Sequence, residues 1–290
     1  MSKVLVVAFD GVDKELIEEF KLDNIPQKEF GTIDNSTDVT TIVTYELFAS
    51  FITGGTWKDH GVIGLTRPEN NVLNSLENLR SIDLFQRTNE VRKKLYNLVP
   101  LIDGEFRRYN KKDLDSETFF EKIASSKAID VPSYNLGYSV ELMPILEKYG
   151  LKEAEKELDR FTNWKRWELF DEMEKDHDLI MAHFHKPDHI HHWYWEVGKM
   201  DKVEETYHEM DEFAGEILEK AEENGFDTVI FMSDHGLPDV ENGGHNENAF
   251  YSCNHELFGD ETPHITDFND KILDLTDRES AGDVVEEINI

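Results

Sequence analysis

Three short apolar runs, each followed at once by acidic or imidazole side chains, constrain the fold of this chain more than any other feature. The runs cover residues 3–10, 178–185 and 227–232 and are rich in aliphatic and aromatic residues. Such runs predict buried strands. Helical patterns lie between them, and this alternation predicts an α/β fold whose mostly parallel central sheet carries helices on both faces.

Apolar residues at helical spacing predict the helices, at residues 13–20, 44–53, 116–124, 139–148, 151–175 and 202–224. No linker rich in Gly, Ser or Pro and no internal repeat divides the chain, so we expect residues 1–290 to form a single domain. Residues 67–115 are polar and charge-rich, with a predicted helix at 82–98, and we interpret them as a small inserted cap. The acidic tail after Asp277 is expected to end in a short helix.

The net charge argues against one class of partner. The chain carries 62 acidic and 30 basic residues, for a net charge of -32, which argues against nucleic-acid binding through a basic surface. So many carboxylates repel one another at low ionic strength, and concentrated salt screens that repulsion. We therefore expect a halophilic source; an acidic enzyme from an ordinary organism is the alternative.

The start of the chain and its single cysteine bear on localisation. One cysteine, Cys253, excludes an intramolecular disulfide, and the chain enters its first strand without a charged leader and long apolar segment. No apolar stretch approaches the roughly 20 residues that cross a bilayer. We expect a cytoplasmic protein without membrane contact, and no feature predicts an oligomeric state.

The polar residues at the strand ends are candidate ligands. Asp10 ends the first run, Asp188 follows the second, and Asp234 with His235 follows the third. Ligands of such sheets bind beyond the carboxyl ends of the strands. Carboxylate beside imidazole suits Zn, Mn or Fe better than Ca. The alternative for Asp10 is a helix cap or turn residue.

A histidine-rich segment around Pro187 supplies further candidates. If Pro187 begins a helix, Asp188 and His192 share one helical face. Spacing alone does not single out His192, because the segment also contains His183, His185, His189 and His191. The alternative is a solvated, histidine-rich surface.

A late histidine, His245, follows Gly244 and precedes a strand-like run. Taken alone, it would be an ordinary loop histidine. Together with the strand ends it completes three Asp and three His, enough to hold two cations about 3.5–4 Å apart. That separation suits phosphoryl transfer.

The predicted helix at 44–53 supplies hydroxyl groups for a nucleophile. Its amino-terminal end favours a phosphate anion through the helix dipole and unpaired N–H groups. Thr40, Thr41 and Thr44 all lie near that end. Each could instead be a helix cap, and spacing does not choose among them.

Six segments carry a family resemblance. In chain order they are VVAFDGVDKELIEEF, TYELFASFITGGTWKDHGVIG, PDHIHH, MSDHG, GGHNENAFYS and ITDFNDKILDLT. Together they resemble the alkaline phosphatase superfamily, specifically its type I phosphodiesterase/nucleotide pyrophosphatase-like branch, over most of the chain. The resemblance implies an alkaline-phosphatase-like fold. It also implies a small-molecule phosphate ester as substrate.

The resemblance assigns the candidate residues to two ion sites. It implies that one divalent ion is held by Asp188, His192 and His245. The other would be held by Asp10, Asp234 and His235 with the hydroxyl oxygen of Thr44, the implied nucleophile of a phosphothreonine mechanism. Zinc is the preferred ion, and manganese, iron or magnesium are the alternatives.

The substrate class is the least defined part of this prediction. The resemblance favours a phosphodiester or nucleotide-type substrate over a monoester, although Leu47 stands where many relatives have Asn. Glu46 would disfavour a highly charged monoester if it pointed inward, and we expect it to face solvent. The alternatives are a phosphomonoesterase or phosphomutase of the same superfamily, or a non-catalytic metal-binding module.

Overall fold

The computed structural model describes residues 2–68, 106–137, 142–195, 197–239 and 244–277. The helix expected at 82–98 and the tail after Asp277 lie outside the described residues. Within the described part of the chain, no helix is both long and apolar enough to cross a bilayer.

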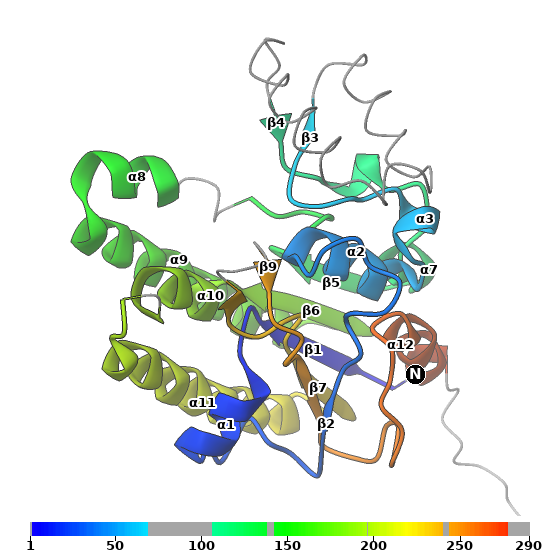
Figure 1. Cartoon of the computed structure of the whole chain (residues 1–290). Helices are drawn as coiled ribbons and strands as arrows, with labels where there is room; N and C mark the ends of the chain where they lie inside the picture. Colours follow the sequence, from blue (N-terminus) through cyan, green and yellow to red (C-terminus); the bar gives the residue numbers. More distant parts are fainter. Residues whose placement is uncertain (1, 69–105, 138–141, 196, 240–243, 278–290) are drawn as a thin grey trace, which may run out of the picture.

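A six-stranded sheet forms the centre of the fold (Figure 1). Its order is β2 (Glu29–Thr32), β10 (Phe250–Cys253), β7 (Thr228–Met232), β1 (Val4–Phe9), β6 (Leu179–Phe184) and β5 (Ser126–Ile129). The four strands from β7 to β5 are parallel, and β10 runs antiparallel to both β7 and β2. The predicted, mostly parallel central sheet is therefore confirmed.

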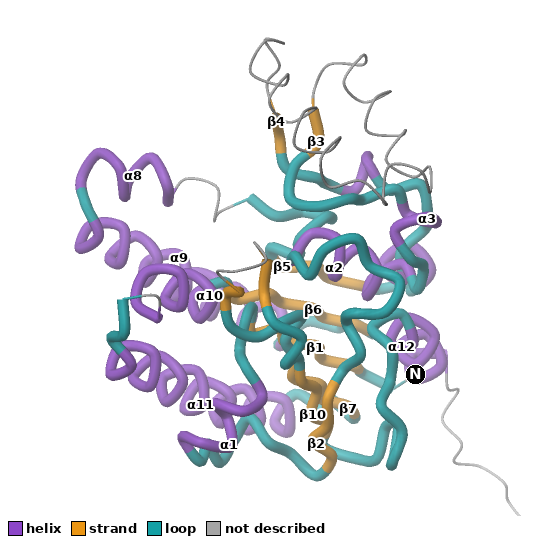
Figure 2. Tube along the Cα trace, viewed as in Figure 1, coloured by secondary structure: helices purple, strands orange, loops and turns teal. Residues whose placement is uncertain are grey.

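Helices cover both faces of this sheet, as Figure 2 shows. One face packs against α1 (Lys14–Phe20), α9 (Leu151–Met173) and α11 (Met200–Glu223), the other against α2 (Thr44–Thr53), α7 (Phe119–Lys122) and α12 (Asp267–Asp277). Alternate residues of β1 enter the two cores, with Leu5 and Val7 on one face and Val4 and Val6 on the other. Both faces of β1 are thus removed from water, as its continuous apolar sequence requires.

Among the described residues, the predicted strands and helices are observed with differences in length, and strands β2 and β5 and the short helix at Trp57–His60 are among the elements that were not predicted. The helix expected at 116–124 is limited to α7, and α8 (Leu142–Tyr149) is described only from Leu142. Strands β2 and β5 lack a continuous apolar run and are mostly half-buried, so periodicity did not predict them.

The ends of residues 67–115 are joined at the base of this stretch. Strands β3 (Arg67–Pro68) and β4 (Phe106–Arg107) pair with each other, and the guanidinium groups of Arg67 and Arg107 both bind the carboxylate of Asp113. Asp113 ends the short 3-10 helix η3 (Lys111–Asp113). A cap formed by this stretch stays a prediction, as does the single-domain organisation.

A buried Ser–His pair ties α2 to the short helix α3 (Trp57–His60). The Ser50 hydroxyl lies 3.0 Å from Nε2 of His60, and Nδ1 of His60 accepts a hydrogen bond from the backbone of Val62 at 3.1 Å. The imidazole is fully buried, and burial lowers its pKa to about 4. His60 therefore stays neutral and links the two helices at neutral pH.

This low pKa predicts a pH-dependent contribution to stability. Because unfolding restores a pKa near 6.5, the stabilisation is complete above that pH and is lost as pH falls toward 4, by about 2 kcal/mol at pH 5. In His60→Asn, which keeps an acceptor for the Val62 N–H, the drop in urea-unfolding free energy between pH 7 and pH 5 should be smaller by about that amount. Equal drops in the two proteins would contradict this assignment.

Candidate metal centre

The carboxyl ends of β1, β6 and β7 meet at one edge of the sheet. Asp10 follows β1 and donates its backbone N–H to the carbonyl of Phe184 at the end of β6, at 3.0 Å. Gly11 has φ 70°, and a Cβ added there would lie 3.1 Å from Cβ of Asp188. A glycine thus permits the left-handed turn and the close approach of the first and second strand ends.

One group of donor atoms comprises Asp188, His192 and His245. Asp188 lies in α10 (Lys186–Ile190), and His192 lies in the π-helical turn η5 (His191–Trp195) that continues it. Nε2 of His192 and Nε2 of His245 each lie 3.4 Å from Oδ1 of Asp188 and 3.2 Å from each other. The three atoms form a nearly equilateral triangle.

A second group comprises Asp10, Asp234, His235 and Thr44. Nε2 of His235 lies 3.4 Å from Oδ1 of Asp10, 3.3 Å from Oδ2 of Asp234 and 3.1 Å from Oγ1 of Thr44. Thr44 Oγ1 lies 3.5 Å from Asp10 Oδ1. The two groups are adjacent, because the rings of His235 and His245 stack with centroids 3.7 Å apart.

These separations fit a tetrahedral ion. Zinc bonds of about 2.0–2.1 Å place neighbouring donor atoms of a tetrahedron about 3.3–3.4 Å apart, and the contacts in both groups span 3.1–3.5 Å. The imidazoles are also suitably oriented. Nδ1 of His235 lies 2.9 Å from the carbonyl of Gly236 and that of His245 lies 3.4 Å from the carbonyl of Ile42, which leaves each Nε2 lone pair for an ion.

The electrostatics of the site also favour bound cations. Burial, and then the charges of Asp234 and Asp188, raise the pKa of Asp10 well above its ordinary value. Burial acts in the same direction on Asp188, but its contact with His245 and the charges of His192 and His235 lower the pKa. Among the described residues, buried Oδ1 of Asp188 and Oδ2 of Asp234 have no hydrogen-bond partner. A bound metal ion would provide the missing partner for both oxygens.

The three candidate threonines occupy different places. Thr44 is the first residue of α2 and points its hydroxyl into the second donor group. Thr40 instead donates its hydroxyl and its backbone N–H to the carboxylate of Glu46. Among these hydroxyls, only that of Thr44 has a described contact with a ligand residue.

The expectation that Glu46 faces solvent is wrong. Its side chain is fully buried and accepts hydrogen bonds from Thr40 and from the backbone N–H of Gly64. Burial raises the pKa of Glu46. The carboxylate satisfies N–H groups of the two loops that flank α2, a role that short-range periodicity does not reveal.

The other histidines of the segment around Pro187 have separate roles. His183 and His185 lie beneath Asp10, with His183 Nε2 3.2 Å from Asp10 Oδ2. His189 stacks on Trp193, and His191 is buried against Tyr207. The solvated histidine surface considered as an alternative is therefore wrong for most of this segment.

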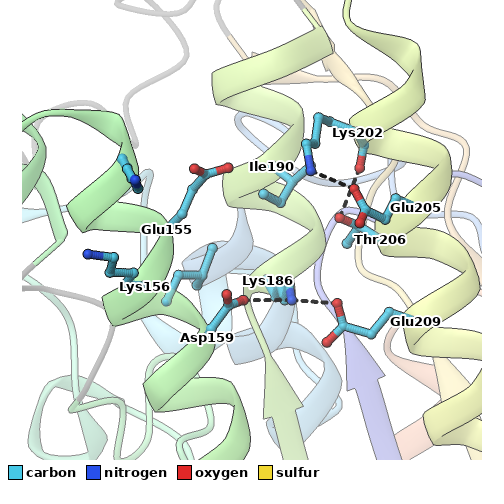
Figure 3. Close-up of a pocket in the computed structure, with 11 residues that line it drawn as sticks. Glu155, Lys156, Asp159, Lys186, Ile190, Lys202, Glu205, Thr206 and Glu209 are labelled. Atoms are coloured by element: carbon cyan, nitrogen blue, oxygen red, sulfur yellow. Dashed lines mark hydrogen bonds and ion pairs between the residues drawn. The ribbon is translucent and has the colours of Figure 1, made fainter.

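A lysine clamps the helix that carries Asp188. The ammonium group of Lys186 lies 2.7 Å from Asp159 of α9 and 2.5 Å from Glu209 of α11 (Figure 3). Figure 3 shows Lys186 between these two carboxylates, in a pocket between the helices. The clamp fixes α10 relative to both neighbouring helices, and so it positions Asp188.

Asp13 joins the loops that carry the ligands. It caps α1 by accepting from the N–H of Glu15 at 2.9 Å, and it accepts from the side chains of Asn246 at 2.9 Å and Asn248 at 3.2 Å. It also receives the N–H of Leu237 at 3.4 Å. One buried carboxylate therefore holds the loops after β1 and β7 and the segment after His245 together.

The sequence matches a known protein family over nearly its whole length. The model of the family described as type I phosphodiesterase / nucleotide pyrophosphatase matches residues 4–288. No curated protein matches the chain.

Solved structures show the fold. The alkaline phosphatase from the Antarctic bacterium TAB5 is 11% identical with a TM-score of 0.52, covering 94% of this chain and 98% of its own. The PH0037 protein from Pyrococcus horikoshii is 13% identical with a TM-score of 0.51, covering 96% and 98%. The predicted alkaline-phosphatase-like fold is confirmed.

A third solved structure is considerably longer than this chain. Murine ectonucleotide pyrophosphatase / phosphodiesterase 5 is 18% identical with a TM-score of 0.47, and the match covers 81% of this chain. It covers 57% of the murine protein.

The role of Asp13 predicts a measurable loss of stability. In Asp13→Asn, an amide NH₂ replaces one carboxylate oxygen and faces donor groups, so the free energy of urea unfolding should fall by about 2–3 kcal/mol. The exposed Asp23→Asn is the matched control and should change stability by less than about 0.5 kcal/mol. Equal effects of the two substitutions would show that Asp13 does not join these loops.

Proposed function

Because the chain belongs to the type I phosphodiesterase/nucleotide pyrophosphatase family, we propose that it is a metal-dependent hydrolase of phosphate esters with Thr44 as its nucleophile. The observation that carries the proposal is the position of the Thr44 hydroxyl, 3.1 Å from His235 Nε2 and 3.5 Å from Asp10 Oδ1. The Thr44 oxygen completes the donor group of Asp10, Asp234 and His235, which lies beside the other donor group. The candidate nucleophile thus lies in the buried donor group, beside the partly exposed one.

The donor set supports two divalent ions, with zinc preferred over manganese, iron or magnesium. Asp188, His192 and His245 would hold one ion. Asp10, Asp234 and His235 would hold the other together with Thr44. Mixed carboxylate and imidazole donors at tetrahedral separations are typical of zinc sites.

In the proposed reaction, Thr44 makes the first of two in-line displacements. Its Oγ1 forms a bond to phosphorus as the bond to the leaving oxygen breaks; the hydroxyl proton passes to solvent, and the leaving oxygen takes a proton from solvent. Water then forms a bond to phosphorus as the bond to Oγ1 breaks, losing a proton to solvent while Oγ1 regains one. This second step releases inorganic phosphate from a monoester and a phosphate monoester from a diester. When bound, the two ions would lower the pKa of both nucleophiles and neutralise charge on the phosphoryl group. The amino-terminal end of α2, where Thr44 lies, favours the phosphate anion.

The preference for a diester or nucleotide-type substrate over a monoester stays a proposal. Arg108 supports an anionic substrate: its guanidinium lies 5.3 Å from the ring centre of Tyr45, the residue after Thr44. Its charge contributes to lowering the pKa of His185 and His189. Glu46, which makes hydrogen bonds elsewhere, offers no argument against a monoester.

Replacing the nucleophile gives the most direct test. Thr44→Ala should lower kcat for a nitrophenyl phosphate ester at least about 1,000-fold, because the substitution removes the proposed attacking oxygen. Thr41→Ala, from the same segment, is the control and should remain active. If Thr44→Ala retains its metal, measured by elemental analysis, and still hydrolyses the ester at a near-normal rate, the proposed mechanism is wrong.

Metal removal tests the reaction class. Treatment with a chelator should abolish hydrolysis, and adding back Zn²⁺, Mn²⁺ or Mg²⁺ should restore it. The assay compares mono- and diesters in concentrated KCl, because the net charge of -32 leads us to expect a salt-rich environment. Activity toward neither ester class with any of the metals would exclude an esterase and favour a non-catalytic metal-binding protein.

A further inference from the structure

A third group of side chains that could ligate a metal consists of Asp10, His183 and His185, and it shares Asp10 with the proposed site. Oδ2 of Asp10 faces Nε2 of His183 at 3.2 Å and Nε2 of His185 at 3.9 Å, and all three side chains are buried. Oδ1 of the same carboxylate faces Thr44 and His235. Asp10 therefore has one oxygen toward the proposed ion pair and the other toward this third group.

The ammonium group of Lys165 lies beside the third group. Lys165 is on α9, and its side chain is only 4% exposed. Nζ lies 2.9 Å from Asp130 Oδ2, 2.8 Å from the backbone carbonyl of His183 and 3.3 Å from Nδ1 of His185. An ammonium has three N–H donors and no acceptor, so these contacts use all of its hydrogen-bonding capacity.

The contact with Lys165 determines which nitrogen of His185 carries the proton. Because an ammonium only donates, Nδ1 of His185 must accept, and the neutral imidazole then carries its hydrogen on Nε2. Nε2 lies 3.9 Å from Oδ2 of Asp10, farther than a hydrogen bond. A protonated Nε2 has no lone pair for a metal ion, so His185 cannot ligate while this contact exists.

The positive charge of Lys165 also disfavours a metal ion at the third group. It would repel a divalent ion placed among Asp10, His183 and His185, and little water is present there to screen that repulsion. A cation is therefore already part of the chain at this position.

We propose that Lys165 takes the place of a third metal ion beneath Asp10 and is a positioning residue for that shared ligand. Its contact with Nδ1 keeps the proton on Nε2 of His185, which then has no lone pair for a further ion, while Oδ1 of Asp10 faces Thr44 and His235. The chain then binds two divalent ions, not three. This inference rests on the two-ion site proposed above.

Counting ions tests the inference without measuring activity. The full chain is stripped with a chelator, saturated with Zn²⁺, desalted and analysed for zinc per chain. Wild type should bind two ions. Lys165→Met, which removes the charge and the ammonium contact with Nδ1 of His185, should bind a third. Lys127→Met is the matched control. Lys127 likewise forms ion pairs, but with Glu168 and Glu172 of α9 and not with the third group, so this variant should bind two ions.

Cadmium NMR on wild type keeps the test valid if Lys165→Met fails to fold. Wild type loaded with ¹¹³Cd²⁺ should give two resonances. A third resonance, or three zinc ions in wild type, would overturn the role of Lys165 but leave the proposed hydrolase intact. Two ions in folded Lys165→Met would likewise overturn it. A wild-type protein that binds no ion would overturn the two-ion site and this inference together.

Discussion

Three carboxylates, Asp10, Asp188 and Asp234, converge where water is largely excluded, and much of the surrounding structure compensates their charge. Isolated buried carboxylates are costly, so such groups neutralise, pair or bind cations. Here the compensation comes from imidazoles on one side and from the Lys165 ammonium on the other. Two of the oxygens that face these imidazoles, Oδ1 of Asp188 and Oδ2 of Asp234, have no hydrogen-bond partner among the described residues and lie where the proposed ions would bind.

The sequence predicted the centre of this fold because its signals there are strong and local. Strand β1 is buried on both faces, so it reads as an uninterrupted apolar run, and the turn that follows must leave Asp10 at the sheet edge. Strands β2 and β5 were missed because their half-buried residues leave no such run. The family resemblance was also recognised from sequence, and the match to residues 4–288 confirms it.

The finer features of the site depend on contacts between distant segments, which spacing does not encode. Position alone left Thr40, Thr41 and Thr44 equivalent, and only the family resemblance favoured Thr44, which begins α2 beside His235. Glu46 was expected at the surface because its partners, the backbones of Thr40 and Gly64, lie in loops without periodicity. Lys165 gave no signal at all, since a lysine in an amphipathic helix normally faces water.

The position of β1 in the sheet has a consequence for how the protein is made. Strand β1 lies in the interior of the sheet and is translated before both of its neighbours, β6, which ends at Phe184, and β7, which ends at Met232. Until those residues have been translated, the segment VLVVAF has both edges unpaired and both faces without a core. Such a segment is prone to aggregate. The interior position of β1 therefore delays the burial of this segment until both neighbouring strands have been translated.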